Sequence, residues 1–434
     1  MFKKIVSICL AALLLVGCFA CLASCGEEKA PETAKKTAAD LKVALICLHG
    51  TDSTYDKNFI DSFKAACAAK GISESNYRIS TGVDEKPECY DAAADYADEG
   101  YDIVFADSFG HEPYMLQAAQ EFPDTQFCHA TGTNAHTANV SNFQDAFASI
   151  YEGRYLAGVA GGLKLIELYG DENGNVSDEN AKVGYVGAWP YAEVISGYTS
   201  FYLGVKSVVP NATMQVRYTN SWYHETAEKL TAQALIADGC KLISQHADSM
   251  GAPTACEEAG IPNVSYNGVT GKNSFVIASK IDWQPYFEYC IDCVLKGEDI
   301  KADYTGTIET GSVQITALGT AAAAGTQEKL DAVKADLVSG ALKVFDCSKF
   351  TVKNAKADTG DFSKAGCITM DEEGHLTAYL ADVDDFGDYI PETNVIRTEN
   401  GVTYFAESAL RSAPYFDVII DGISIGAEVV VPEE

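Results

Sequence analysis

The chain has 434 residues, enough for two domains and an appendage. Hydrophobic residues make up 47% of it and charged residues 21%, which is the composition of a folded globular protein rather than a disordered one. The formal net charge of −31 argues against binding to nucleic acid or to anionic lipid through charge.

The N-terminal residues have the pattern of a secretory signal. Lys3 and Lys4 precede an apolar run from Ile5 to Ala23, and a polar stretch begins at Gly26. Positive residues followed by an apolar core are typical of a signal peptide. A plain transmembrane anchor is the alternative, because the run approaches the length that spans a membrane.

A cysteine lies at the end of this segment. Leu22-Ala23-Ser24-Cys25 resembles the lipobox of bacterial lipoproteins, in which the cysteine receives a diacylglyceryl group. We predict a signal peptide with its lipobox over residues 1–25, lipidation at Cys25 or alternatively at Cys18, and a flexible tether over residues 26–40. The protein is therefore expected on the extracytoplasmic face of a bacterial cell membrane, held there by its lipid.

Apolar runs and helical periodicities alternate in the next part of the chain. The pattern predicts a strand over 41–48, a helix over 58–70, a helix over 91–97, a strand over 101–104, a helix over 112–121 and a strand over 125–130. Alternation at this interval indicates βαβ units and a parallel sheet.

The alternation begins again after a long helix over 148–166, which is rich in small residues. Strands are predicted at 182–187, 214–218, 242–245, 264–266 and 275–280, with helices ending at 205 and covering 225–237. A helix that begins at Trp283 is expected to pack on the first half of the chain. The sequence thus predicts two similar lobes.

One short motif occurs in both halves. Phe105-Ala106-Asp107-Ser108-Phe109-Gly110 follows the strand at 101–104, and His246-Ala247-Asp248-Ser249-Met250-Gly251 follows the strand at 242–245. Small molecules bind at the carboxyl ends of strands in open α/β sheets. The motif predicts that the two lobes share one cleft, to which each contributes a polar corner.

Several segments resemble the basic membrane protein (BMP) family of substrate-binding lipoproteins. The matching segments are Asp56-Lys57-Asn58-Phe59, Ser108-Phe109, Tyr155-Leu156-Ala157-Gly158, Lys182 to Gly187, and Ser279-Lys280. Their order and spacing carry the resemblance, which covers about residues 41–320. The best-understood members of the family are purine-nucleoside receptors of ABC importers.

The resemblance implies a type I periplasmic-binding fold, in which two mostly parallel α/β lobes are joined by three crossings. Lobe 1 would comprise residues 41–150 and 281–300, lobe 2 residues 151–280 and 301–343, and a β-rich appendage residues 344–434. It also implies a monomeric receptor that closes on a small polar solute, with a purine nucleoside as the first expectation, and delivers it to an ABC permease and its ATPase. Receptors for a sugar or another small metabolite, and a surface sensory or adhesin lipoprotein, remain alternatives.

The family's nucleoside pocket carries over in part. Asp56 matches a carboxylate that holds ribose, Phe59 an aromatic that stacks on the base, and Lys280 the hinge-side lysine. Three positions differ from the family pattern: Thr131 or His129 and Asn267 stand where the family usually has aspartates, and Gly197 where it has an aromatic residue.

The strand-end loops supply the residues that a polar solute needs, namely aromatic faces and a few donors and acceptors. The candidate binding residues are Asp56, Asn58, Phe59, Asp107, Ser108, Phe109, Thr131, Trp189, Trp222, Asp248, Asn267 and Lys280. Packing in the core is the alternative for the aromatic residues. Capping of a helix N-terminus is the alternative for Asp107 and Asp248.

No catalytic, metal or cofactor site is predicted. The chain contains no Gly-x-Ser-x-Gly, His-Glu-x-x-His or P-loop motif. Paired aspartates could in principle serve a glycosidase, which leaves an enzyme as the competing class. Cys290 and Cys293 form a CxxC on a predicted helix without a second pair, and several other cysteines lie in apolar runs, as small buried hydrophobes do. The acidic run 382–388 lacks the glutamate of a calcium loop.

Overall fold

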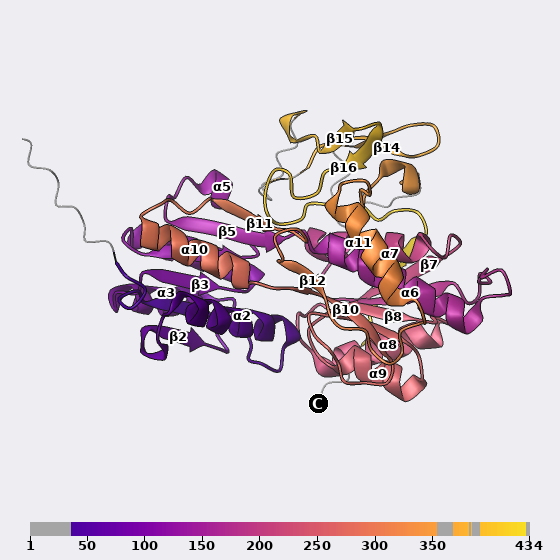
Figure 1. Ribbon diagram of the computed structural model, residues 1–434, viewed down its shortest axis with the longest axis horizontal. Coiled ribbons are helices and arrows are strands. Elements are labelled where there is room, and N and C mark those ends of the chain that lie inside the picture. The colour runs from indigo at the N-terminus through magenta and orange to yellow at the C-terminus, as the bar shows by residue number, and fades with distance from the viewer. Residues whose placement is uncertain (1–35, 354–367, 382, 384–390, 431–434) are drawn as a thin grey trace, which may run out of the picture. The chain divides into compact units, whose positions relative to one another are not determined.

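The computed structural model describes residues 36–353, 368–381, 383 and 391–430 (Figure 1). The predicted signal peptide over 1–25 with Cys25 and Cys18, most of the tether over 26–40 and nearly all of the acidic run 382–388 lie outside these residues. Among the helices that are described, none has both the length and the hydrophobicity to cross a membrane.

Lobe 1 is built on a parallel sheet of six strands in the order β11-β5-β4-β3-β1-β2. Its strands are β1 (Val43–Ile46), β2 (Tyr77–Ser80), β3 (Ile103–Ala106), β4 (Gln126–Ala130), β5 (Phe143–Ala148) and β11 (Asp303–Gly306). Its helices are α2 (Thr54–Lys70), α3 (Pro87–Asp98), α4 (Glu112–Glu121), the short α5 (Ala135–Ala138) and α10 (Gln284–Lys296). Strands β1 and β3 are buried at every position, as expected for parallel strands covered by helices on both faces.

Lobe 2 is built on a sheet of seven strands in the order β12-β10-β9-β8-β6-β7-β17. Its strands are β6 (Lys182–Gly187), β7 (Thr213–Tyr218), β8 (Ile243–His246), β9 (Asn263–Tyr266), β10 (Phe275–Ile281), β12 (Val313–Ile315) and β17 (Ile423–Ile425). Its helices are α6 (Ile150–Tyr169), α7 (Ala192–Lys206), α8 (Glu225–Ala237), α9 (Gly251–Ala259) and α11 (Thr326–Val338). Only β12 runs antiparallel to its neighbour within this sheet.

The chain passes three times between the two sheets, after β5, after β10 and after β11. This confirms the predicted two-lobed α/β fold. As predicted, the helix after Trp283 packs on lobe 1: Trp283 stacks on Phe59 of α2, with ring centroids 4.2 Å apart. The assignment of all of residues 301–343 to lobe 2 is wrong, because β11 pairs with β5 in the sheet of lobe 1. The side chain of Tyr304 in β11 stacks on Tyr289 of α10, which fixes the strand at that edge.

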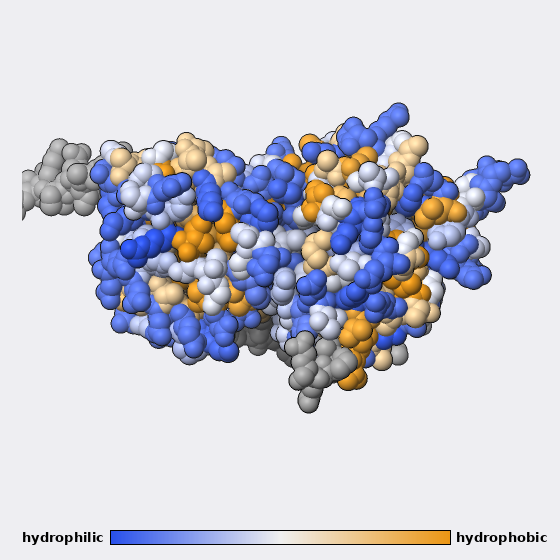
Figure 2. Space-filling model, turned by 90° about the horizontal axis from the view of Figure 1, so that it is seen from below, coloured by the Kyte–Doolittle hydropathy of each residue, from blue (hydrophilic) through white to orange (hydrophobic). Residues whose placement is uncertain are grey.

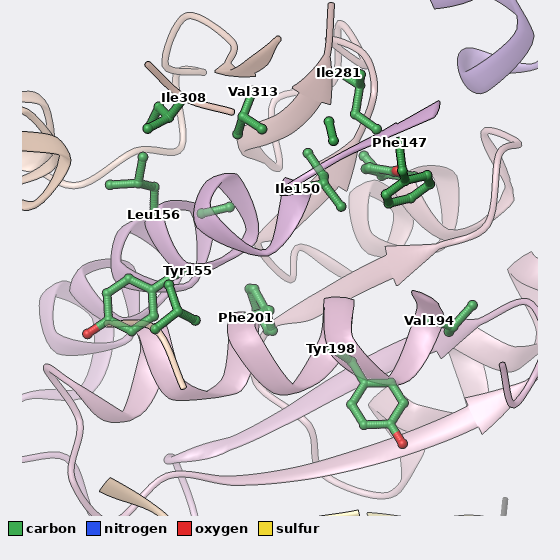
Figure 3. Packing of buried hydrophobic residues seen from close by; sticks show 14 of the residues in the cluster. Phe147, Ile150, Tyr155, Leu156, Val194, Tyr198, Phe201, Ile281, Ile308 and Val313 are labelled. Atoms are coloured by element: carbon green, nitrogen blue, oxygen red, sulfur yellow. The ribbon is translucent and has the colours of Figure 1, made fainter. Parts of the chain in front are cut away.

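Helices α6 and α7 pack with their backbones in contact (Figure 3). A Cβ atom on Gly158 would lie 2.1 Å from the carbonyl oxygen of Phe201, and one on Gly204 would lie 2.1 Å from that of Tyr155. Only glycine permits this approach. The Tyr155–Gly158 motif that carried part of the family resemblance therefore serves packing within lobe 2.

The described part of the appendage contains two antiparallel hairpins and one strand of the lobe 2 sheet. The hairpins are β13 (Ile368–Met370) with β14 (Leu376–Tyr379), and β15 (Ile396–Glu399) with β16 (Val402–Phe405). Strand β17 adds to the edge of the lobe 2 sheet by pairing in parallel with β7. Single turns of 3-10 helix occur at Glu74–Asn76, Phe109–His111, Cys347–Lys349 and Pro391–Thr393.

The surface and the interior agree with the composition. Figure 2 shows a face that is mostly hydrophilic, with smaller apolar patches between the polar side chains. The nine described cysteines after Cys25 are all buried and free, so they pack as small hydrophobes.

Candidate functional site

A small cavity lies between the lobes at the carboxyl ends of the strands. Lobe 1 contributes the corner after β1, the start of α2 and the loops after β3 and β4, and lobe 2 contributes the start of α7, the loop after β7 and the ends of β8 and β9. The cavity measures about 20 Å³, which is room for about one water molecule. The lobes are therefore in a closed arrangement.

Six of the predicted binding residues line this cavity: Asp56, Ser108, Phe109, Thr131, Trp222 and Asp248. They come from both lobes, and both copies of the repeated motif contribute. Neither Asp107 nor Asp248 caps a helix, since the N-cap residues of the helical segments that follow are Ser108 and Met250. The capping alternative is therefore wrong for both aspartates.

Phe59 and Lys280 do not line the cavity. Phe59 is 1% exposed and lies in the core of lobe 1 against Trp283, so the packing alternative describes it. Lys280 lies in β10, where its register partner is Gln314 of β12. Phe59 and Lys280, which match the family's aromatic residue and its lysine, therefore lie outside the cavity wall.

Four further candidates, Asp107, Trp189, Asn58 and Asn267, do not line the cavity either. Asp107 is fully buried behind it and accepts a hydrogen bond from the backbone N–H of Leu48 at 3.1 Å. Trp189 stacks on Tyr191, with centroids 5.8 Å apart. The side-chain amide of Asn58 donates to Oδ1 of Asn267 at 2.9 Å, which joins the two lobes.

The other six residues of the cavity wall were not among the predicted binding residues: Leu48, His49, Tyr55, Glu193, His246 and Tyr266. His246 is the first residue of the second copy of the repeated motif. Tyr55 lies one residue before Asp56, and Glu193 lies in the first turn of α7 after the Trp189 corner. In the sequence, proximity to a predicted strand end is the one signal that could have indicated these six wall residues.

Asp56 is the cavity carboxylate that is held in its charged form. Its Oδ1 accepts a hydrogen bond from the backbone N–H of His49 at 2.7 Å, and its Oδ2 accepts one from the hydroxyl of Ser53 at 2.5 Å. Burial opposes ionisation, but these bonds together with the His49 ring lower the pKa of Asp56 below its ordinary value.

The other carboxyl groups at the cavity are shifted the opposite way. Burial, and then the charge of Asp56, raise the pKa values of Asp107 and Asp248 well above the ordinary aspartate value. Burial raises the pKa of Glu193 to about 7. The cavity therefore combines one firmly ionised carboxylate with carboxyl groups that lose their protons only reluctantly.

Direct hydrogen bonds between the lobes close the cavity. The backbone N–H of Thr54 in lobe 1 donates to the carbonyl oxygen of Asp248 in lobe 2 at 3.1 Å. The hydroxyl of Thr131 in lobe 1 donates to Oε2 of Glu193 in lobe 2 at 3.1 Å. Both bonds must break if the lobes are to separate.

Gly197 explains how the lobe 2 wall differs from the family pattern. A Cβ atom on Gly197 would lie 2.9 Å from Nδ1 of His246. The ring of His246 therefore lies close against the face of α7 where the family has an aromatic side chain. Beside it, the guanidinium of Arg154 lies 3.5 Å from the centroid of the Tyr266 ring, so a cation–π stack supports this wall.

Two buried clusters bring possible metal ligands together, Cys47 with Asp56 and Asp107, and Glu112 with His129 and Asp145. In the second cluster, Glu112 accepts hydrogen bonds from the backbone N–H groups of Thr133 and Asn134, and Asp145 accepts one from that of Ala135. These oxygens already hold the loop after β4 in place. In the first cluster, burial raises the pKa of the Cys47 thiol, which disfavours the thiolate that a metal requires.

A larger cavity of 640 Å³ lies elsewhere, between α6, α7, the segment after α11 and the appendage. Its wall includes Tyr155, Leu203, Lys206 and Leu342, and it contains no residue from the strand-end corners. Ligands of open α/β sheets bind at those corners. We therefore place the candidate site in the smaller cavity between the lobes.

Two α/β lobes joined by three crossings, with loops of both lobes meeting at one cavity, are the architecture of solute receptors that close by a hinge motion. The chain belongs to the Bmp family, described as ABC transporter substrate-binding protein PnrA-like, whose model matches residues 51–344. This confirms the family resemblance. It also confirms that the protein is of a receptor class rather than an enzyme class.

Relatives of this chain include three proteins that are named as binding proteins. The putative ABC transporter glucose-binding protein TsgA13 of Haloferax volcanii is 31% identical over 59% of this chain and 62% of its own length. The purine-binding protein BAB2_0673 of Brucella abortus is 29% identical over 66% of this chain and 76% of its own length. The ABC transporter nucleoside-binding protein BmpA of Lactococcus lactis is 25% identical over 58% of this chain and 67% of its own length.

Solved structures share the fold. An ABC transporter solute-binding protein from Conexibacter woesei superimposes with a TM-score of 0.56 at 22% identity, over 70% of this chain and 98% of its own. An ABC transporter solute-binding protein from Aeropyrum pernix superimposes with a TM-score of 0.58 at 13% identity, over 70% of this chain and 93% of its own. At these identities the likeness shows the arrangement of the lobes alone.

Proposed function

We propose that this protein is the lipid-anchored extracytoplasmic receptor of an ABC importer and that it binds a small polar solute, a purine nucleoside first of all, between its lobes. It then delivers the solute to a membrane permease driven by an ATPase. Binding and closure are its whole mechanism, and no bond of the solute is made or broken.

One observation carries the proposal: loops from both lobes place carboxyl groups and aromatic rings around the same cavity. Asp56 and Glu193 offer acceptors for hydroxyl and N–H groups, and Phe109, Trp222 and Tyr266 offer ring faces. A nucleoside presents the complementary groups, since its ribose donates hydrogen bonds and its base stacks.

The size of the cavity implies that binding requires motion. A pocket for a small organic ligand usually measures about 300–1,000 Å³, whereas this cavity measures about 20 Å³. Separation of the lobes would break the Thr54–Asp248 and Thr131–Glu193 hydrogen bonds and admit the solute. Closure around the solute would then replace some of these contacts with contacts to the solute.

The names of two relatives support a nucleoside, since one is called purine-binding and another nucleoside-binding. The name of the Haloferax volcanii relative supports a second candidate, glucose. Carboxylates and aromatic faces suit a sugar as well as a ribose. Lys280, which would neutralise a carboxylate beside a bound ribose, does not line the cavity, and this keeps the sugar in consideration.

Calorimetric titration with adenosine, guanosine, inosine and glucose tests the proposal directly. We expect at least one of these solutes to bind with one site per chain and to emerge chemically unchanged. Replacement of Trp222 by alanine should weaken that binding, whereas replacement of the exposed Leu168 by alanine is the control. Failure of all four solutes to bind, or turnover of any one of them, would contradict the proposed function.

The anchor and the partners form a separate part of the proposal. Cys25 and the lipobox lie outside the described residues, and their assignment rests on the sequence pattern. Metabolic labelling with a radioactive fatty acid should mark the wild-type protein and not the Cys25→Ser variant. If labelling is lost in Cys18→Ser and kept in Cys25→Ser, the lipid is attached to Cys18 instead.

A further inference from the structure

Glu193 occupies an unusual position for a carboxylate in the first turn of a helix. Helix α7 has no side-chain hydrogen bond at its N-cap, although a carboxylate there could accept from the free N–H groups of the first turn. Instead, Oε2 of Glu193 accepts from the hydroxyl of Thr131, and Oε1 lies 3.3 Å from Nε2 of His246. The carboxyl group therefore contacts both lobes at the cavity.

Among the described residues, no lysine or arginine is hydrogen-bonded to this carboxyl group, but the charge of Arg154 acts on it: burial raises the pKa of Glu193, and the bond from Thr131 and the charge of Arg154 lower it. Burial and the charge of Arg154 lower the pKa of His246 well below its ordinary value, so the ring beside Glu193 is neutral at neutral pH. The guanidinium of Arg154 lies over Tyr266 and its Nη1 donates to the carbonyl oxygen of Gln245 at 2.7 Å, whereas its Nε and Nη2 have no hydrogen-bond partner among the described residues. Glu193 thus has hydrogen-bonding neighbours and no ion-pair partner among the residues of the cavity wall.

The cavity wall is rich in carboxyl groups. Its ionisable residues are the carboxyl groups of Asp56, Glu193 and Asp248, the phenols of Tyr55 and Tyr266, and the rings of His49 and His246. Burial acts to lower the pKa of His49, but Asp56, 3.5 Å away, raises it above its ordinary value, so the charge of this ring belongs to its pair with Asp56. The described wall contains no lysine and no arginine. An anionic group brought into this small, poorly hydrated space would face these carboxyl groups with no lysine or arginine in the wall to bind it.

Resting on the proposed function, we infer that Glu193 is the specificity-determining residue of the cleft. It accepts a hydrogen bond from a hydroxyl or N–H group of the solute, and it rejects analogues that carry a phosphate or carboxylate group. The accepted class is therefore uncharged or cationic solutes rich in hydrogen-bond donors, and their phosphorylated forms are excluded.

Glu193 is better placed for this role than the other two carboxyl groups. Each oxygen of Asp56 already accepts a hydrogen bond within lobe 1, one from the backbone of His49 and one from Ser53. Asp248 meets lobe 1 through its backbone carbonyl, which accepts from Thr54. Among the carboxyl groups of the wall, only that of Glu193 has a described side-chain hydrogen bond to the opposite lobe, so it meets the solute at the moment of closure.

Paired solutes test the inference. Calorimetric titration compares adenosine with adenosine 5′-monophosphate, ribose with ribose 5-phosphate, and glucose with glucose 6-phosphate. The proteins are the wild type, Glu193→Gln, which removes the charge and keeps the shape, and Thr131→Val, which removes the bond between the lobes and keeps the carboxyl group. Thermal unfolding of each variant checks that it is folded.

We expect the wild type to prefer the unphosphorylated member of a pair by about 100-fold or more. Glu193→Gln should reduce that preference about tenfold or more, whereas Thr131→Val should weaken both members equally and keep the preference. An unchanged preference in Glu193→Gln, or an equal loss of both members, would overturn the inference while leaving the receptor function standing. A wild type that binds no member of any pair would overturn the proposed function, and the inference with it.

Discussion

Asn58 in α2 and Asn267 after β9 are joined by a hydrogen bond of 2.9 Å that crosses from one lobe to the other. Asn267 adopts a left-handed backbone conformation with φ of 59°, which asparagine tolerates better than most residues. Its Oδ1 also accepts from the backbone N–H of Ile281 at 3.3 Å, at the end of β10. The bond therefore links the start of the cavity-forming helix to one of the three crossings.

Asn58→Ala should weaken solute binding about fivefold, because it removes one hydrogen bond, worth about 1 kcal/mol, that is present only when the lobes are closed. Calorimetric titration measures the change. Lys57→Ala is the matched control, since Lys57 is exposed on the same helix and pairs only with Asp61 one turn away. Equal affinity of Asn58→Ala and wild type would show that this bond does not stabilise closure.

Phe59→Ala should lower the free energy of unfolding by about 3–5 kcal/mol, because a buried ring stacked on Trp283 is lost. Trp222→Ala should have a small effect on unfolding and a large one on binding, because Trp222 is half-buried and lines the cavity. Urea denaturation and titration of each folded variant separate the two effects. If Phe59→Ala weakens binding more than it destabilises the fold, Phe59 contacts the solute after all.

The contrast between these two aromatics shows what the sequence could and could not predict. Helical spacing predicts that Phe59 lies on the apolar face of α2, whereas the family motif predicts that it contacts the solute. The sequence alone does not distinguish these two environments. Glu193 was missed because its partner Thr131 lies 62 residues away in the sequence. Contacts between lobes depend on how the lobes close, and no local pattern encodes that.

The strands with an apolar or alternating pattern were predicted, and several strands without such a pattern were missed. Strand β6 matches its predicted bounds, as do helices α4 and α8. Strand β5 was missed because its buried positions include Gln144 and Asp145, and Asp145 is tolerated there because His129 and the backbone of the loop after β4 donate to it. Edge strand β11 was missed because Asp303–Gly306 has no apolar run.

Stability should fall as the pH rises from 6 to 8. Burial raises the pKa values of Glu152, Glu193 and Glu228 to about 7 and that of Glu407 to about 8. Since these groups bind protons more tightly in the folded state, their contribution is full below the unfolded-state pKa and is lost as the pH rises through the folded-state values. The lowered pKa of His246 acts oppositely, but mainly below pH 6.5. Thermal unfolding in a pH series should therefore give a higher midpoint at pH 6 than at pH 8.

Glu407→Gln provides the control for this pH dependence. Glu407 is 6% exposed, and its Oε1 accepts a long hydrogen bond, of 3.4 Å, from the backbone N–H of Phe416. Its replacement by glutamine should reduce the slope of unfolding free energy against pH between 6 and 8, by up to about 1.4 kcal/mol per pH unit for one proton. A slope identical to that of the wild type would mean that Glu407 is ionised throughout this range.

The appendage should slow the release of solute, because its described part is attached to both lobes. Strand β17 pairs with β7 of lobe 2, and the backbone N–H of Ser412 donates to Oδ1 of Asp303 in β11 of lobe 1 at 2.7 Å. A hydrogen bond to a carboxylate is worth about 1.5–3 kcal/mol, so its loss should ease opening of the closed lobes. Ser412→Pro removes the donor and Asp303→Ala removes the acceptor, and both should raise the dissociation rate about fivefold or more in stopped-flow measurements. Ser412→Ala keeps the backbone donor and should release the solute more slowly than Ser412→Pro. Wild-type release from Ser412→Pro and Asp303→Ala would mean that the appendage packs on the lobes without restraining them.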